Sequence, residues 1–223
     1  MTSPSDVPIR AEGVTLEGTL SIPGHARGVV LFAHGSGSSR FSPRNRAVAG
    51  VLHEQGFATL LLDLLTPQEE RVDAYTAQLR FDVSMLARRL VAAVDWLSHA
   101  ADTTHLPLGC FGASTGAGAA LVAAADRPSL INGIVSRGGR PDLAGSALPR
   151  VKAPTLLVVG SKDRQVVDLN RMALTKLRCE KRLSIVPGAT HLFEEPGTLE
   201  QVAIQARDWC QQNLKPEVQY GGT

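Results

Sequence analysis

Residues 106–125 read LPLGCFGASTGAGAALVAAA, and this stretch decides the predicted fold. Leu106 to Phe111 is an apolar run of strand-like length, whereas Gly112 to Ala125 is rich in small residues and compatible with a helix. Between them, Gly112-Ala113-Ser114-Thr115-Gly116 matches GxSxG. In a nucleophile elbow the turn from strand to helix is so tight that small residues must flank the serine. The context therefore predicts that the Ser114 hydroxyl projects beside a helix N-terminus.

Two other interpretations compete for the same glycines. Gly112, Gly116 and Gly118 also match GxxxGxG, the spacing of short-chain dehydrogenases, but that motif follows the first strand and precedes a YxxxK pair. Here it lies at mid-chain, neither Tyr75 nor Tyr220 begins YxxxK, and the GK[ST] ending of a P-loop is missing. A purely structural use of the glycines, for close packing of helix on strand, stays open.

The rest of the chain alternates between strand and helix signals. Apolar runs bounded by turn residues predict strands at 14–22, 28–33, 57–65, 106–111, 131–135, 155–159 and 183–186. Helical spacing or capping signals predict helices at 43–55, 75–100, 112–125 and 199–214, with a polar segment at 66–74. Such alternation predicts an α/β fold with a mostly parallel sheet and helices on both faces. We expect one domain over 1–223 with a frayed tail at 215–223, and segment 136–154 is too short for a substantial cap.

Composition excludes several classes of function. The formal net charge of +2 in 223 residues gives no reason to expect nucleic acid or a membrane surface as a partner. Cys110, Cys179 and Cys210 lack the paired spacing of a disulfide framework or a zinc knuckle. The N-terminus lacks a signal-peptide pattern, and no apolar segment approaches the roughly 20 residues that cross a bilayer. We expect a cytoplasmic protein with no metal and no cofactor.

A serine nucleophile requires a base, and the base needs an acid that orients it. In elbow-containing folds the chain order is serine, then acid, then histidine. Five of the six histidines precede Ser114, and only His191, in the loop after the last predicted strand, follows it. His191 is therefore the predicted base, although a lone loop histidine is usually a solvated surface residue.

Three aspartates are candidates for the acid. Asp163 follows the strand at 155–159, at the strand edge where catalytic groups gather in open α/β sheets. Asp142, in the loop after the preceding strand, is the alternative, and Asp168 fits better as a helix N-terminal residue. Asp163 is the predicted acid.

An oxyanion also needs hydrogen-bond donors. The predicted donors are the backbone N–H of Thr115 and that of Ser36, with Gly37 as the alternative to Ser36. Ser36 lies in the glycine-rich loop His34-Gly35-Ser36-Gly37, which follows an earlier strand; an ordinary turn is the other interpretation.

Substrate contacts are expected from the same loop and from the arginines after it. The candidates are His34, Gly35, Gly37, Arg40 and Arg44. Arg40, Arg44 and Arg46 form a cluster that could attract a carboxylate or phosphate, although such arginines more often are solvated or pair with acids such as Glu69 and Glu70. Asp63, at another strand end, is a further possible lining residue.

HGSGSS (34–39), GASTG (112–116), GSKD (160–163) and GATHLF (188–193), in this order, resemble the α/β-hydrolase superfamily and, within it, the dienelactone hydrolase-like group. The resemblance covers roughly residues 20–210. It implies a Ser114–His191–Asp163 triad and an acyl-enzyme mechanism. Dienelactone hydrolases proper use a cysteine nucleophile, and their substrate-carboxylate arginines find no matching positions here.

The lactone substrate is therefore not carried over. The expected function is hydrolysis of a small carboxylic ester, thioester or lactone in an open crevice, with a small molecule as the only expected partner. Acyl transfer by the same residues and a non-catalytic binding module are the alternatives.

Overall fold

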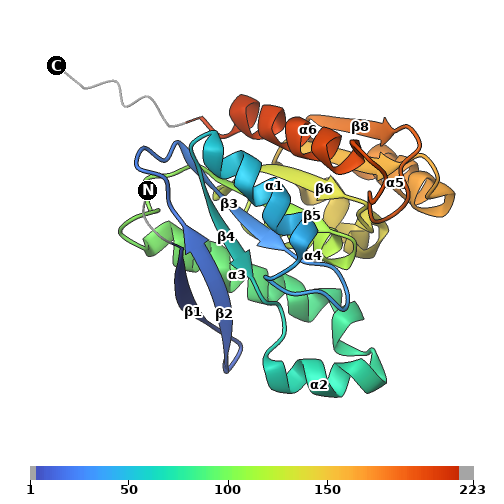
Figure 1. Cartoon of the computed structure of the whole chain (residues 1–223). Helices are drawn as coiled ribbons and strands as arrows, with labels where there is room; N and C mark the ends of the chain where they lie inside the picture. Colours follow the sequence, from blue (N-terminus) through green and yellow to red (C-terminus); the bar gives the residue numbers. More distant parts are fainter. Residues whose placement is uncertain (1–3, 216–223) are drawn as a thin grey trace.

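The computed structural model describes residues 4–215 and contains one eight-stranded sheet flanked by helices (Figure 1). The strands are β1 (Ser5–Ala11), β2 (Val14–Ser21), β3 (Gly28–Ala33), β4 (Phe57–Leu62), β5 (Leu108–Ala113), β6 (Ile131–Arg137), β7 (Thr155–Gly160) and β8 (Lys181–Val186). The α-helices are α1 (Pro43–Glu54), α2 (Pro67–Thr76), α3 (Val83–His99), α4 (Thr115–Asp126), α5 (Arg164–Lys176) and α6 (Thr198–Asn213). Two 3₁₀ segments, η1 (Leu79–Phe81) and η2 (Pro141–Arg150), complete the order.

The strand order is β1-β2-β4-β3-β5-β6-β7-β8. β1 pairs with β2 and β2 with β4 in antiparallel fashion, and the remaining neighbours are parallel. The chain passes from β3 to β4 on one side and then crosses to β5 on the other. Ligand sites in open α/β sheets form at such a switch point, beyond the carboxyl ends of the strands. The ends of β3 and β5 therefore mark where a site is expected.

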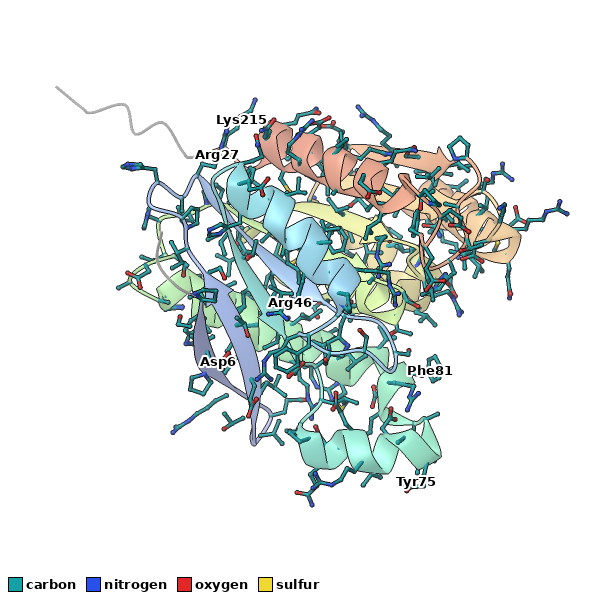
Figure 2. All side chains as sticks on the ribbon, in the orientation of Figure 1. Asp6, Arg27, Arg46, Tyr75, Phe81 and Lys215 are labelled. Atoms are coloured by element: carbon teal, nitrogen blue, oxygen red, sulfur yellow. The ribbon has the colours of Figure 1, made fainter. Side chains whose placement is uncertain are left out.

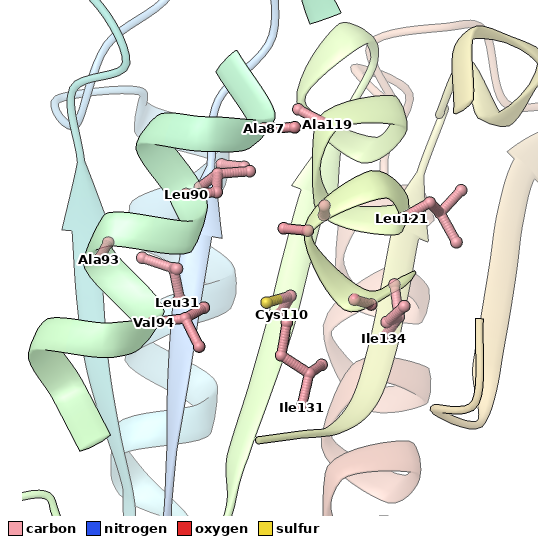
Figure 3. Close-up of a cluster of buried hydrophobic side chains, with 14 of the residues drawn as sticks. Leu31, Ala87, Leu90, Ala93, Val94, Cys110, Ala119, Leu121, Ile131 and Ile134 are labelled. Carbon is pink, nitrogen blue, oxygen red and sulfur yellow. The ribbon is translucent and has the colours of Figure 1, made fainter. Parts of the chain in front are cut away.

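Helices cover both faces of the sheet, which confirms the predicted fold class. α1 and α6 lie on one face, over a core that includes Phe32, Phe111 and Trp209. α3, α4 and α5 cover the other face, and Figure 3 shows Leu90 and Val94 of α3 facing the sheet beside α4. The central strands β3, β4, β5 and β7 are buried along their whole length, as strands covered on both faces should be.

The helix predicted over 75–100 is wrong at its start. The segment expected only to be polar forms α2, which ends at Thr76, and α3 begins after η1, at Val83. Ala77 takes a left-handed conformation, and the Asp82 side chain accepts the N–H of Met85 as a new N-cap. Helical spacing of apolar residues cannot report such a break, because the breaking signals are capping bonds.

The remaining differences concern edges and connections. β1 forms a hairpin with β2, and of these two strands the sequence predicts only β2. The sequence also gives no bounds for α5. Segment 136–154 contains the end of β6 and η2, and within residues 4–215 no cap domain covers the sheet edge. Apart from Lys215, the tail expected to fray lies outside the described residues.

Candidate active site

Ser114 lies in a strained turn between β5 and α4. Its φ of 50° and ψ of −120° are unusual for a residue with a side chain. The flanking glycines allow this turn: a Cβ on Gly112 would lie 2.4 Å from Cα of Ala117, and a Cβ on Gly116 would lie 2.4 Å from the carbonyl oxygen of His34. The glycines of GASTG are therefore required by close backbone approach, as a nucleophile elbow demands.

The predicted acid and base meet through the loops after β7 and β8. His191 Nδ1 lies 2.6 Å from Asp163 Oδ2. Asp163 occupies the N-cap position of α5, but its side chain makes no capping bond, so the carboxylate is available to the imidazole. Neither alternative acid has this contact, since Asp142 accepts from Arg140 and Asp168 from Arg171.

Glu195, which is not among the predicted site residues, stabilises the loop that carries His191. Glu195 accepts the backbone N–H of Thr190 with both oxygens, at 3.1 and 3.2 Å. These backbone hydrogen bonds lower the pKa of Glu195. Nothing in the local sequence distinguishes this glutamate from its neighbour Glu194.

Ser114 and His191 line the same cavity of about 160 Å³. Within residues 4–215, no hydrogen bond joins the Ser114 hydroxyl to the His191 ring. Catalytic hydrogen bonds are often long or misaligned in free enzymes and tighten when substrate binds. The geometry thus brings Ser114, His191 and Asp163 to one place. The Asp163–His191 hydrogen bond is formed, and the His191–Ser114 hydrogen bond is not.

The glycine-rich loop after β3 lies against the nucleophile. A Cβ on Gly35 would be 3.0 Å from Cβ of Ser114, and Ser36 Oγ lies 3.0 Å from Thr115 Oγ1. Among the described residues, neither the Ser36 nor the Thr115 backbone N–H donates to another protein group. Both N–H groups are therefore free to donate to an oxyanion. This is consistent with the oxyanion hole predicted at Ser36 and Thr115, which stays a prediction.

His34 is a structural member of this loop. Its Nε2 accepts the N–H of Leu64, which leaves the proton on Nδ1, 2.9 Å from the Gly35 carbonyl. Burial lowers the pKa of His34, so the ring is neutral. Its contribution to substrate binding is limited to the wall of a second cavity.

This second cavity, of about 290 Å³, shares Gly35, Ser36 and Ser38 with the Ser114 cavity, and its lining includes Thr115 but not His191. It is lined by His34, Gly35, Ser36, Gly37, Ser38, Ser39, Leu64, Leu65, Glu70, Asp73, Ala74, Arg80, Leu86 and Thr115. Residues of α2 and η1 close its outer side, and Figure 2 shows Tyr75 and Phe81 at this end of the molecule. Burial raises the pKa of Glu70 in its wall.

The three clustered arginines take separate places. Arg40 turns away from Ser114 and binds Asp63 and Glu17, so the structure does not bring this candidate or Asp63 to the nucleophile. Arg44 does line the Ser114 cavity. Arg46 is exposed and its guanidinium lies over the Phe41 ring.

Four residues that line the Ser114 cavity are not among the predicted site residues, namely Ser38, Ser42, Arg137 and Leu192, and Arg137 is the charged one. Arg137, the last residue of β6, lines the cavity and is 7% exposed. Its position at the carboxyl end of a strand next to β5 is the signal that could have identified it. Burial, and to a lesser degree the nearby Arg44 charge, lowers its pKa to about 10, so Arg137 remains a cation at neutral pH.

Neither a cluster of metal-ligating side chains nor a membrane-spanning helix occurs in the part of the chain that the structure describes. In residues 4–215 no three His, Cys, Asp or Glu side chains gather as a metal site. The same part of the chain has no helix of the length and apolarity needed to traverse a bilayer.

Comparison with solved structures identifies close and distant relatives. The dienelactone hydrolase from Anabaena variabilis is 59% identical, with a TM-score of 0.94 over 96% of this chain and 99% of that chain. Est1E from Butyrivibrio proteoclasticus (17% identity, TM-score 0.77, 93% and 98% coverage) and XC6422 from Xanthomonas campestris, described as an a/b serine hydrolase without lid (18%, 0.74, 95% and 95%), share the fold.

Curated relatives carry a different name. A protein of Mycobacterium tuberculosis named "Putative phosphoribosyl transferase" is 57% identical over 204 residues, which are 92% of this chain and 45% of the relative. This chain thus spans about half the length of the curated relatives it matches. The family model of dienelactone hydrolases matches residues 16–214, nearly the whole chain. The chain belongs to the dienelactone hydrolase family, and the family and the 59% identical relative indicate a hydrolase.

Proposed function

We propose that this chain is a serine hydrolase that cleaves a small carboxylic ester, thioester or lactone through an acyl-enzyme on Ser114. The observation that carries the proposal is the elbow serine in a common cavity with a histidine that is already bonded to a half-buried carboxylate. A strained elbow and an oriented imidazole cost stability and have no structural use together, which argues against a non-catalytic module.

The proposed reaction has two halves. His191 Nε2 removes the Ser114 proton as Oγ attacks the carbonyl carbon, and Asp163 stabilises the imidazolium through Nδ1. The N–H groups of Ser36 and Thr115 hold the oxyanion until it collapses and the leaving oxygen or sulfur takes the proton from His191. Water, deprotonated by His191, then attacks the acyl carbon, and Ser114 departs with the proton.

Water is the simplest acceptor for an open site. The cavities around Ser114 face solvent without a cap, so water reaches the acyl-enzyme unless an acceptor binds first. Acyl transfer uses the same residues and would show as product partitioning with an added alcohol. Phosphoribosyl transfer, the activity in the name of the M. tuberculosis relatives, could belong to the half of those proteins outside the match.

The test combines labelling and turnover. The purified protein is treated with a fluorophosphonate probe, the adduct is mapped by mass spectrometry, and p-nitrophenyl acetate hydrolysis is followed. Labelling should occur at Ser114, and Ser114→Ala should lower kcat by roughly 10⁴-fold or more. Ser129→Ala, an exposed serine far from the site, is the matched control and should keep full activity. An unlabelled, inactive wild-type protein would favour a binding module.

A further inference from the structure

Arg137 is a buried cation without a counter-charge. Its side chain forms no hydrogen bond or ion pair with any residue in 4–215, and its Nε is buried and unpartnered. The other buried arginine, Arg89, makes two bonds to Glu69 and one to the Leu64 carbonyl. An unpaired buried charge is costly, because desolvation is not offset by a partner.

The cavity in front of Arg137 contains a second cation and no acid. It is lined by Gly35, Ser36, Ser38, Ser42, Arg44, Ser114, Arg137, His191 and Leu192. The Arg44 guanidinium has one acidic contact in the described chain, a 3.5 Å approach to Glu194, which is itself exposed. Two guanidinium groups therefore share a small cavity with the Ser114 hydroxyl, and each repels the other.

The position of His191 indicates which part of a substrate would occupy the cavity beside Arg137. The imidazole that takes the Ser114 proton must return it to the leaving atom, so the leaving group lies on the His191 side of the carbonyl. His191 lines the arginine cavity, whereas the lining of the larger cavity includes Thr115 but not His191. The larger cavity has the Asp73–Arg80 ion pair and Glu70 in its wall and no unpaired cation, so it suits an acyl group without an anionic charge.

We propose that Arg137 and Arg44 form an anion subsite for the leaving group, so that the preferred substrates are esters or thioesters whose alcohol or thiol part carries a carboxylate or phosphate. This inference rests on the proposed function. A planar guanidinium binds either anion through paired, charge-assisted hydrogen bonds. The bound anion supplies the counter-charge that the protein lacks.

The first experiment compares matched esters. The acetates of para-hydroxybenzoate, para-hydroxyphenyl phosphate and para-hydroxybenzamide share one acyl group and a similar ring, and differ in the charge of the leaving group. For wild-type protein, kcat/KM should be higher for an anionic ester than for the amide. Arg137→Met and Arg44→Gln should each reduce this ratio by about tenfold to a hundredfold, and the amide ester measured on the same variant divides out any general loss of activity.

Arg46→Gln tests for a general effect of positive charge, and Arg44→Gln covers the case in which Arg137→Met does not fold. Arg46→Gln removes an exposed cation from the same helix as Arg44, and the ratio should stay unchanged. If Arg46→Gln lowers the ratio as much as Arg137→Met, a general positive field and not a subsite explains the preference, and the proposal falls. Should Arg137→Met fail to fold, Arg44→Gln on the partly exposed helix surface still decides.

A binding measurement separates this proposal from the proposed function. Calorimetry of the free phenols on wild type and Arg137→Met needs no turnover. Tighter binding of para-hydroxybenzoate or para-hydroxyphenyl phosphate than of the amide, lost in Arg137→Met, supports the subsite even if Ser114 proves inert. The stronger of the two anions identifies carboxylate or phosphate. Equal binding of all three phenols would overturn the proposal, whatever the esterase assays show.

Stability gives an independent readout. Because methionine removes an unpaired buried charge, Arg137→Met without added anion should melt no lower than wild type. A large loss of melting temperature would mean that folding also depends on Arg137, and the subsite is then decided by the ratio measured on Arg44→Gln.

Discussion

At the scale of single residues, the site depends on backbone strain at Ser114. A side-chain-bearing residue at positive φ costs about 1–3 kcal/mol and persists only where its surroundings over-determine it. Here the Ser114 N–H donates to the Arg137 carbonyl, and the Ser114 carbonyl accepts from Ala117 and Arg140. The same segment after β6 thus holds the nucleophile and supplies the cation beside it.

Asp163→Asn tests the acid at this scale. The amide keeps the shape of the side chain but favours the wrong His191 tautomer, so kcat should fall by about 10³-fold to 10⁴-fold with little change in melting temperature. Asp142→Asn is the control, because Asp142 only pairs with Arg140, and it should retain activity. Steady-state kinetics on both variants decide, and loss of activity in Asp142→Asn alone would move the acid to the earlier loop.

The sequence could predict the residues that act through chain order. Ser114, Asp163 and His191 each follow a recognisable strand, and the elbow glycines are local signals. Arg137 was missed because it ends a strand of apolar residues, and only the fold shows that nothing neutralises it. Arg40 was expected near the substrate because it is close in sequence, but two carboxylates, Asp63 and Glu17, turn it away.

At the scale of elements, α2 is held by charges and contributes little to the core. Asp73 is its one buried residue. Thr66 and Glu69 form a reciprocal capping box, and Glu69 binds Arg89 of α3 at 2.6 and 2.8 Å. The sequence signal for α2 was weak because a polar helix without an apolar stripe is stabilised mainly by such partners.

These contacts make α2 sensitive to acid. Burial alone would raise the pKa of Glu69 and of Asp73, but bonds from Arg89 to Glu69, and from Arg80 and backbone N–H groups to Asp73, lower both. A lowered native pKa stabilises the folded state above the unfolded pKa of about 4, and this stabilisation is lost as the pH falls through the native values. Glu70, whose pKa is raised, partly opposes the effect.

Hydrogen exchange checks this expectation. After correction for intrinsic rates, residues 67–76 should exchange faster at about pH 3.5 than at pH 7. Helix α4 should keep its protection, because its ion pair, between Asp126 and Arg150, is exposed and lies at the last residue of the helix. Equal protection of α2 at both pH values would show that packing and not charge holds it.

At the scale of the whole molecule, two apolar layers enclose the sheet. Cys110 lies in the layer under α3 and α4, Cys210 lies in the layer under α6, and Cys179 is half-buried. The alternation of strands and helices was enough to predict these layers, since each central strand is apolar throughout. The connections were less predictable, because capping and ion pairs define them.

The thiols report on both layers. Burial raises the pKa of Cys110 and of Cys210 to about 12, so neither forms the reactive thiolate near neutral pH. Ellman's reagent should therefore titrate at most Cys179 in the native protein and all three thiols in denaturant. Rapid reaction of two or more thiols without denaturant would mean that one layer opens independently.

The two cavities that share Gly35, Ser36 and Ser38 have a stereochemical consequence. If the acyl group enters one and the leaving group the other, with the oxyanion between them, Ser114 attacks a single face of the carbonyl. A stereocentre next to the ester oxygen then directs one substituent toward Arg137 and another toward solvent. The protein would act as a chiral resolving agent, with an enantiomeric ratio that depends on the charge of the alcohol.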